Sequence, residues 1–76
     1  MSAASGIAAW HGMSCRWHDL AARRLFFYVR LFESGRWRLY FDSRSDFLAH
    51  MASVRELERT WARLAGRPAA DLDLPP

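Results

Sequence analysis

Two long stretches of the chain repeat apolar residues every three or four positions, a spacing typical of amphipathic helices. The first runs from Ser14 to Glu33 without a proline or a glycine. Its apolar residues share one broad face when successive positions are turned by about 100°: Trp17, Leu20, Ala21, Leu25, Tyr28, Leu31 and Phe32. Ser14 is the expected N-cap, and Gly35 suits the left-handed position that ends a helix. The pattern predicts a helix over about residues 15–33.

The second stretch predicts a helix over about residues 46–65. Its apolar stripe consists of Phe47, Met51, Val54, Leu57, Trp61, Leu64 and Ala65. Ser43 or Ser45 would cap its start, and Gly66 followed by Pro68 would end it. Two helices of this length, each about 30 Å long, are expected to form an antiparallel hairpin. The predicted fold class is therefore all-α.

The segment between the helices, residues 34–42, alternates apolar and polar side chains. Trp37, Leu39 and Phe41 recur with a period of two, which is the spacing of an extended chain. A lone strand would have no partner within one copy, so we expect an extended aromatic connector that folds over the end of the hairpin. A short strand that pairs across a dimer axis is the alternative.

The first helix presents more apolar surface than one hairpin partner can cover, because its apolar arc spans about 200°. Phe26, Phe27 and Val29 are left over and form a candidate oligomer face. Two copies that pair into a four-helix bundle would bury them, which predicts a homodimer. A docking face for a different protein is the alternative.

The ends of the chain lack this periodicity. We expect a flexible leader over residues 1–13, a hairpin domain over residues 14–66 and a flexible, proline-rich tail over residues 67–76. Met13 is an alternative start to Met1, because the patterned sequence begins only after it. The leader lacks the basic start and the apolar stretch of a secretory signal, which favours a cytoplasmic location.

Composition narrows the picture further. A chain of 76 residues forms one domain at most, and its single cysteine excludes an internal disulfide. The net charge is +3, with eleven arginines and no lysine. Residues 1–40 carry six arginines and two acids, whereas residues 41–76 carry five arginines and six acids. This asymmetry suits an anionic partner or head-to-tail contact between copies.

One charged residue lies at the middle of each apolar face, Arg24 on the first helix and Glu58 on the second. When Glu33 is set level with Asp46, Arg24 is level with Arg55, and Glu58 is three residues further along. The helical rise makes that offset about 4.5 Å, which an arginine side chain spans. We therefore predict a partly buried structural ion pair between Arg24 and Glu58.

The inventory for chemistry is short. His11, Cys15, His18 and His50 are residue types that bind zinc, but their spacing is irregular, so we expect no metal site and no cofactor. The chain contains no glycine-rich phosphate loop and no nucleophile at a recognisable spacing from a base. The sequence therefore predicts a protein that is not an enzyme.

The connector holds the best candidate ligand contacts: Arg36, Trp37, Arg38 and Tyr40. Arginines interleaved with aromatic residues can neutralise phosphates while the rings stack on bases. The same chemistry suits an anionic membrane surface. Packing of the aromatic residues against the hairpin, with the arginines solvated, is the interpretation we favour, because the basic half lacks the clustered charge of a dedicated nucleic-acid-binding protein.

Several motifs carry a resemblance to known sequences: R-W-x-x-L-A-x-x-R-L from Arg16, E-S-G-R-W-R-x-Y from Glu33, and F-L at Phe47. With these motifs the chain resembles a family of small, uncharacterised bacterial proteins. The resemblance covers residues 16–65 and implies a small helical protein, with no activity attached. We therefore expect a protein–protein interaction or structural module, and a weak nucleic-acid-binding or membrane-surface module is the alternative.

Overall fold

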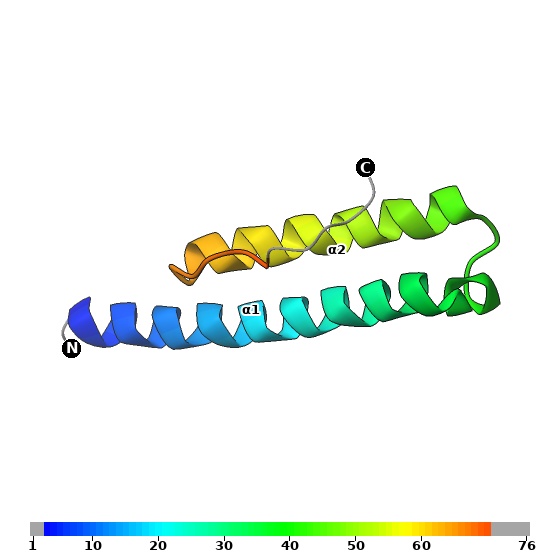
Figure 1. Cartoon of the computed structure of the whole chain (residues 1–76). Helices are drawn as coiled ribbons and strands as arrows, with labels where there is room; N and C mark the ends of the chain where they lie inside the picture. Colours follow the sequence, from blue (N-terminus) through cyan, green and yellow to red (C-terminus); the bar gives the residue numbers. More distant parts are fainter. Residues whose placement is uncertain (1–2, 71–76) are drawn as a thin grey trace.

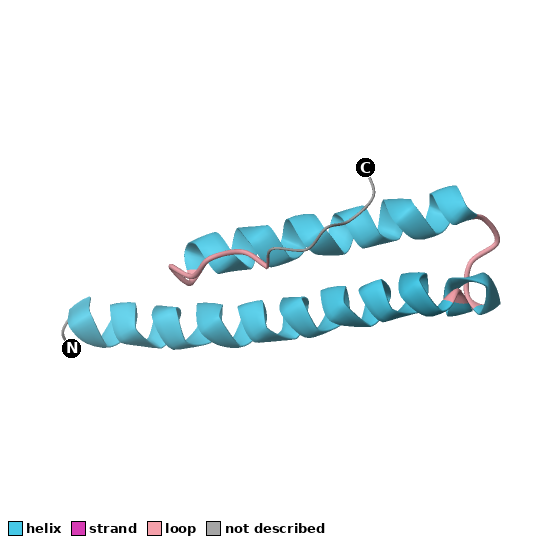
Figure 2. Ribbon diagram, in the orientation of Figure 1, coloured by secondary structure: helices cyan, strands magenta, loops and turns pink. Residues whose placement is uncertain are grey.

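The structure is a computed structural model that describes residues 3–70. Two helices, α1 (Ala3–Ser34) and α2 (Arg44–Leu64), run antiparallel (Figure 1). A short 3-10 helix, η1 (Arg36–Leu39), lies in the turn between them. Figure 2 shows that loop segments occur beside η1 and after α2, while helices make up the rest of the described chain. The prediction of an all-α helical hairpin is confirmed.

The predicted start of the first helix is wrong. α1 begins at Ala3, so residues 3–13 are helical rather than a flexible leader, and residues 1–2 lie outside the described part. Ser14 is not an N-cap but a buried residue in mid-helix, and its hydroxyl donates to the carbonyl of Trp10 at 2.9 Å. The alanine-rich sequence before it favours a helix strongly enough to accommodate Gly6 and Gly12. In Figure 1 this N-terminal part of α1 extends past the end of α2.

The other helix boundaries agree with the expected signals. Gly35 has a φ of 75°, the left-handed conformation that ends α1. The Ser43 hydroxyl accepts the backbone N–H of Asp46 at 3.1 Å and caps α2. Gly66, with a φ of 69°, turns the chain back after α2. Each boundary therefore has a local cause that the sequence displays.

The connector is not extended, which corrects the expectation for this segment. Its backbone closes on itself, because the N–H groups of Tyr40 and Phe41 donate to the carbonyl of Trp37 at 3.1 and 2.9 Å. An extended single strand would leave such groups without a partner in the chain. Trp37 and Phe41 do fold back over the hairpin as expected, but Leu39 is 78% exposed.

The core has two unlike halves. Near the turn, the fully buried Phe47 is surrounded by aromatic rings, with centroids at 5.2–6.2 Å, from Tyr28, Phe32, Trp37 and Phe41. Toward the other end of α2 the buried residues are small or polar: Ser14, His18, Ala21, Glu58, Ala62 and Ala65. The small side chains let the two helices approach closely there. Large apolar side chains of that half are consequently displaced to the flank of the hairpin.

Candidate interaction surface

Two tryptophans define one flank of the hairpin. Trp17 on α1 and Trp61 on α2 stack with ring centroids 6.0 Å apart and planes inclined by 22°. Trp17 is nevertheless 49% exposed, because nothing in the described chain covers the outer side of this flank. We call the flank formed by the following residues the open flank: Trp10, Met13, Trp17, Leu20, Arg24, Leu57, Trp61 and Leu64. Each of its large apolar residues retains substantial accessible surface.

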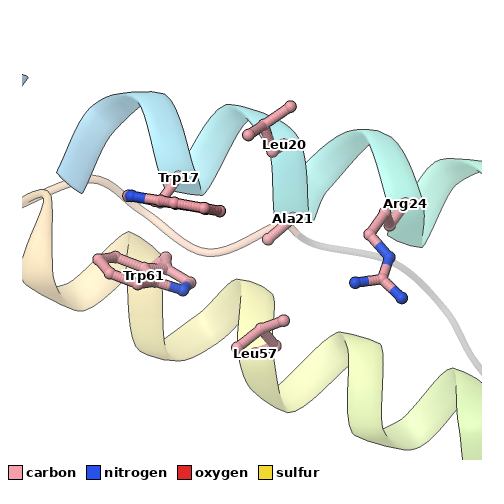
Figure 3. Close-up of a pocket in the computed structure, with 6 residues that line it drawn as sticks. All are labelled: Trp17, Leu20, Ala21, Arg24, Leu57 and Trp61. Atoms are coloured by element: carbon pink, nitrogen blue, oxygen red, sulfur yellow. The ribbon is translucent and has the colours of Figure 1, made fainter. Parts of the chain in front are cut away.

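The open flank is hollowed beside the stacked rings. A shallow pocket of about 240 Å³ is bounded by Leu20 and Ala21 of α1, Leu57 of α2 and the two tryptophans (Figure 3). Arg24 closes its end toward the turn. The lining is almost entirely apolar, with a single guanidinium as its charged group. Such a surface suits apolar side chains of a partner rather than a polar substrate.

The predicted ion pair between Arg24 and Glu58 is wrong. Glu58 is completely buried, but its carboxylate contacts His18, whereas Arg24 lies exposed beside the pocket. The expected level of the helices was nearly right, since Trp17 meets Trp61 within one residue of it. The expected rotation of α1 about its own axis was wrong. Arg24 precedes the fully buried Leu25 and so points about 100° away from the seam.

The opposite flank is closed by the chain itself. Glu58 Oε2 lies 2.6 Å from Nε2 of His18, a residue only 8% exposed. Both carboxylate oxygens of Glu58 accept the backbone N–H of Ala70, at 3.1 Å each. Ala70 also packs against the apolar core. A buried carboxylate with these donors holds the segment after α2 against the hairpin.

Arg67 holds the same segment against α1 through hydrogen bonds. Its Nη1 donates to Asp19 at 2.7 Å and to the carbonyl of Cys15 at 3.5 Å, and lies 3.4 Å from Nδ1 of His18. Because a guanidinium only donates, this last contact favours the His18 tautomer with its proton on Nε2, facing Glu58. The hydrogen bond to Asp19 raises the pKa of Arg67 above its ordinary value. We call Arg67–Ala70 the C-terminal strap.

The strap falls within the predicted flexible tail, residues 67–76. Residues 67–70 are held by the contacts just described, which corrects the expectation for them. Residues 71–76 lie outside the described part of the chain. Sequence reasoning missed His18 and Ala70 as partners of Glu58, and Arg67 as a partner of His18 and Asp19. The signal in the sequence was a glutamate in the middle of an apolar face.

The predicted oligomer face does not form one surface. Phe26 and Phe27 are 49% and 56% exposed, whereas Val29 is partly buried. Consecutive helical residues point about 100° apart, so Phe26 and Phe27 face different directions. Their role in self-association stays a prediction, whereas the open flank is an apolar surface to which both helices contribute.

The candidate ligand contacts of the connector are divided by the structure. Arg36, Arg38 and Tyr40 are exposed, but Trp37 is partly buried. One face of the Trp37 ring stacks on Phe47 at 5.8 Å, and the guanidinium of Arg38 lies over the ring at 5.4 Å. Trp37 is therefore occupied within the fold, which leaves Tyr40 as the exposed aromatic ring of the connector.

The candidate zinc residues do not assemble. Cys15 Sγ lies 3.6 Å from Nε2 of His11, but His18 is turned to Glu58, and His50 packs beside Phe41 near the turn, with ring centroids 5.1 Å apart. Among residues 3–70 no cluster of three potential ligands is arranged to hold a metal ion. In the same part of the chain neither helix combines the length and hydropathy that a membrane span requires.

Comparison with known proteins places this hairpin in a family. The model of a family described as conserved hypothetical protein CHP03809 matches residues 11–75. The chain belongs to this family. Both stacked tryptophans and every residue of the strap lie in the part that matches CHP03809. No curated protein and no solved structure matches the chain.

Proposed function

We propose that the protein is a non-enzymatic interaction module that binds a helical protein partner through its open flank. The observation that carries the proposal is the exposure of Trp17 and Leu20, 49% and 44%, beside Leu57 at 41% on the other helix. A group of large exposed apolar side chains on a small protein marks an interaction site. Tryptophan is also the residue most enriched among the dominant contacts of interfaces.

The spacing of the exposed residues favours a helix as the partner. Trp10, Met13, Trp17 and Leu20 follow one another at intervals of three, four and three residues, and Leu57, Trp61 and Leu64 at four and three. An alternation of three and four is the pattern that packs knobs into holes against another helix. A homodimer with a four-helix bundle is one form of such packing, although the sequence assigned its contact face to Phe26, Phe27 and Val29 rather than to the open flank.

The chemistry of the flank favours binding over catalysis. Its one ionisable group is Arg24, whose guanidinium offers neither a nucleophile nor a base. A nucleic-acid partner is less well supported, because Trp37, the ring expected to stack on bases, packs on Phe47 inside the fold. An apolar surface between two helices fits a protein.

Photo-crosslinking in the native cells tests the proposal. A photoreactive residue in place of Leu20 lies on the open flank, and one in place of the exposed Arg23 lies on the outer side of α1 as a matched control. We expect a discrete protein adduct from position 20 and none from position 23. The absence of any adduct at position 20, with the variant folded and expressed, would show that the flank is not an interface.

A further inference from the structure

We infer that the partner of the open flank is a second copy of this chain, and that two hairpins pack flank to flank around a two-fold axis. The inference rests on the proposed function and names its partner. Three features of the flank carry it: its area, the part of it that lies beyond α2, and its charge.

The exposed area matches what a small dimer needs. The six exposed apolar residues of the open flank each retain 40–49% of their surface: Trp10, Met13, Trp17, Leu20, Leu57 and Leu64. For side chains of this size, that fraction amounts to about 600 Å² per copy. A symmetric pair that covers this whole area buries on the order of 1,200 Å² in total, the lower end of the range for stable interfaces. The exposed apolar area of the flank is therefore large enough to form an interface with the same flank of a second copy.

Part of the flank lies where the hairpin cannot cover it. Trp61 is level with Trp17, so Leu64, the last residue of α2, reaches about one turn further toward the N-terminus of α1. Trp10 and Met13 lie on the turns of α1 that extend past this point (Figure 1). They are 47% and 40% exposed on the same stripe as Trp17. A second hairpin supplies the neighbouring helix that α2 does not provide there.

The charge of the open flank distinguishes a second copy from a different protein as its partner. The open flank contains the guanidinium of Arg24 and no carboxylate, so a copy of the same flank offers it indole rings but no counter-ion. Arginine stacks on indole faces and its stem packs against apolar neighbours. In a self-pair Arg24 is thus replaceable by an apolar residue of similar length. A different protein that recognised Arg24 would bring a carboxylate and would lose affinity on that replacement.

The strap covers the flank opposite the open flank, which we call the closed flank, and this limits the assembly to two copies. The closed flank is the side of the hairpin that carries His18 and Glu58, so the apolar groove between the two helices is open on one side. Two copies that pair through this one self-complementary surface form a closed dimer rather than a fibre.

Sedimentation equilibrium of the purified full-length chain tests the inference. We expect a mass of twice 8.8 kDa at tens of micromolar. Leu20→Glu places a charge in the flank and is expected to weaken association by about tenfold or more. Arg23→Glu, on the outer side of α1, and Arg24→Met, on the flank, should both retain the dimer. Circular dichroism establishes that every variant keeps its helices.

Each other result contradicts the inference. A wild-type chain that sediments as a monomer at these concentrations, a Leu20→Glu variant that remains a folded dimer, or an Arg24→Met variant that dissociates would each overturn the second copy as partner. If position 20 still crosslinks to another protein in cells while the purified chain is monomeric, the proposed function stands and this inference fails. If neither crosslink nor dimer forms, both are wrong.

Discussion

The two flanks of this hairpin are built from the same pair of helices yet present opposite chemistry. On the closed flank a buried carboxylate, Glu58, binds His18 and the amide of Ala70, so the chain covers its own surface. On the open flank Trp17, which stacks on the partly buried Trp61, is 49% exposed. The difference teaches that polar contacts can complete a fold within one small chain, while apolar surface left beside them points to a second molecule.

The largest effect is expected on the closed flank. Glu58→Ala leaves the His18 ring and the Ala70 amide without their acceptor, and loss of one member of a buried pair costs about 3 kcal/mol or more of unfolding free energy. Urea denaturation measures the loss. Glu56→Ala, which removes an exposed carboxylate two residues earlier in α2, is the control and should stay within about 0.5 kcal/mol. Equal effects from the two variants would show that the buried contacts do not stabilise the fold.

A double-mutant cycle distinguishes the two possible partners of Glu58. The effects of His18→Leu and Glu58→Leu should be non-additive by about 1 kcal/mol or more, because the two side chains touch at 2.6 Å. Arg24→Leu and Glu58→Leu should instead add, since Arg24 lies on the other flank. Strong coupling between Arg24 and Glu58 would restore the ion pair that the sequence predicts and contradict this division of the flanks.

Removing one tryptophan of the stack should cost less stability. In a chain kept monomeric by Leu20→Glu, Trp61→Ala is expected to lower the free energy of unfolding by about 1 kcal/mol, the size of an aromatic pair at a partly exposed site. In the otherwise wild-type chain the same change should also weaken the dimer, so its effect on stability should grow with protein concentration. A cost that does not depend on concentration would place Trp61 outside the interface.

The smallest effect is expected from Arg67→Ala. The contact with Asp19 is exposed and therefore weak, but it positions the strap over Glu58. We expect faster hydrogen exchange at the Ala70 amide with little change in the amides of α2, whereas Arg63→Ala should leave the Ala70 amide unchanged. The raised pKa of Arg67 favours its charged form in the folded protein, so the contact with Asp19 is present at neutral pH and is lost as the pH rises through the folded pKa. Unaltered exchange at Ala70 would mean that Glu58 alone holds the strap.

The sequence predicted the architecture because local signals determine it. Gly35, Ser43 and Gly66 act through their own backbone or hydroxyl groups, so their roles are visible without a structure. The two apolar periodicities identified the helices. The start of α1 was missed because the stretch before Ser14 consists mostly of small residues and contains Gly6 and Gly12, although Trp10 and Met13 continue the stripe of Trp17 there.

The arrangement of the surface could not be predicted, since it depends on which side of each apolar arc faces the other helix. Counting apolar residues put Trp17 and Leu20 in the seam, but the seam is lined by smaller residues such as Ala21 and Ala62. Because these smaller residues face the other helix, Arg24 points outward and His18 contacts Glu58. The strap depends on contacts across about fifty residues, which no local pattern reports.

The most direct test of this account is the detection of intermolecular nuclear Overhauser effects in a mixture of isotope-labelled and unlabelled chains. We predict contacts between copies at the side chains of Trp17, Leu20, Leu57 and Trp61. Contacts between His18 and the strap should arise only within one copy. Intermolecular contacts confined to the His18 side, or none at concentrations where the chain is expected to be paired, would contradict the claim that the open flank is where two copies meet.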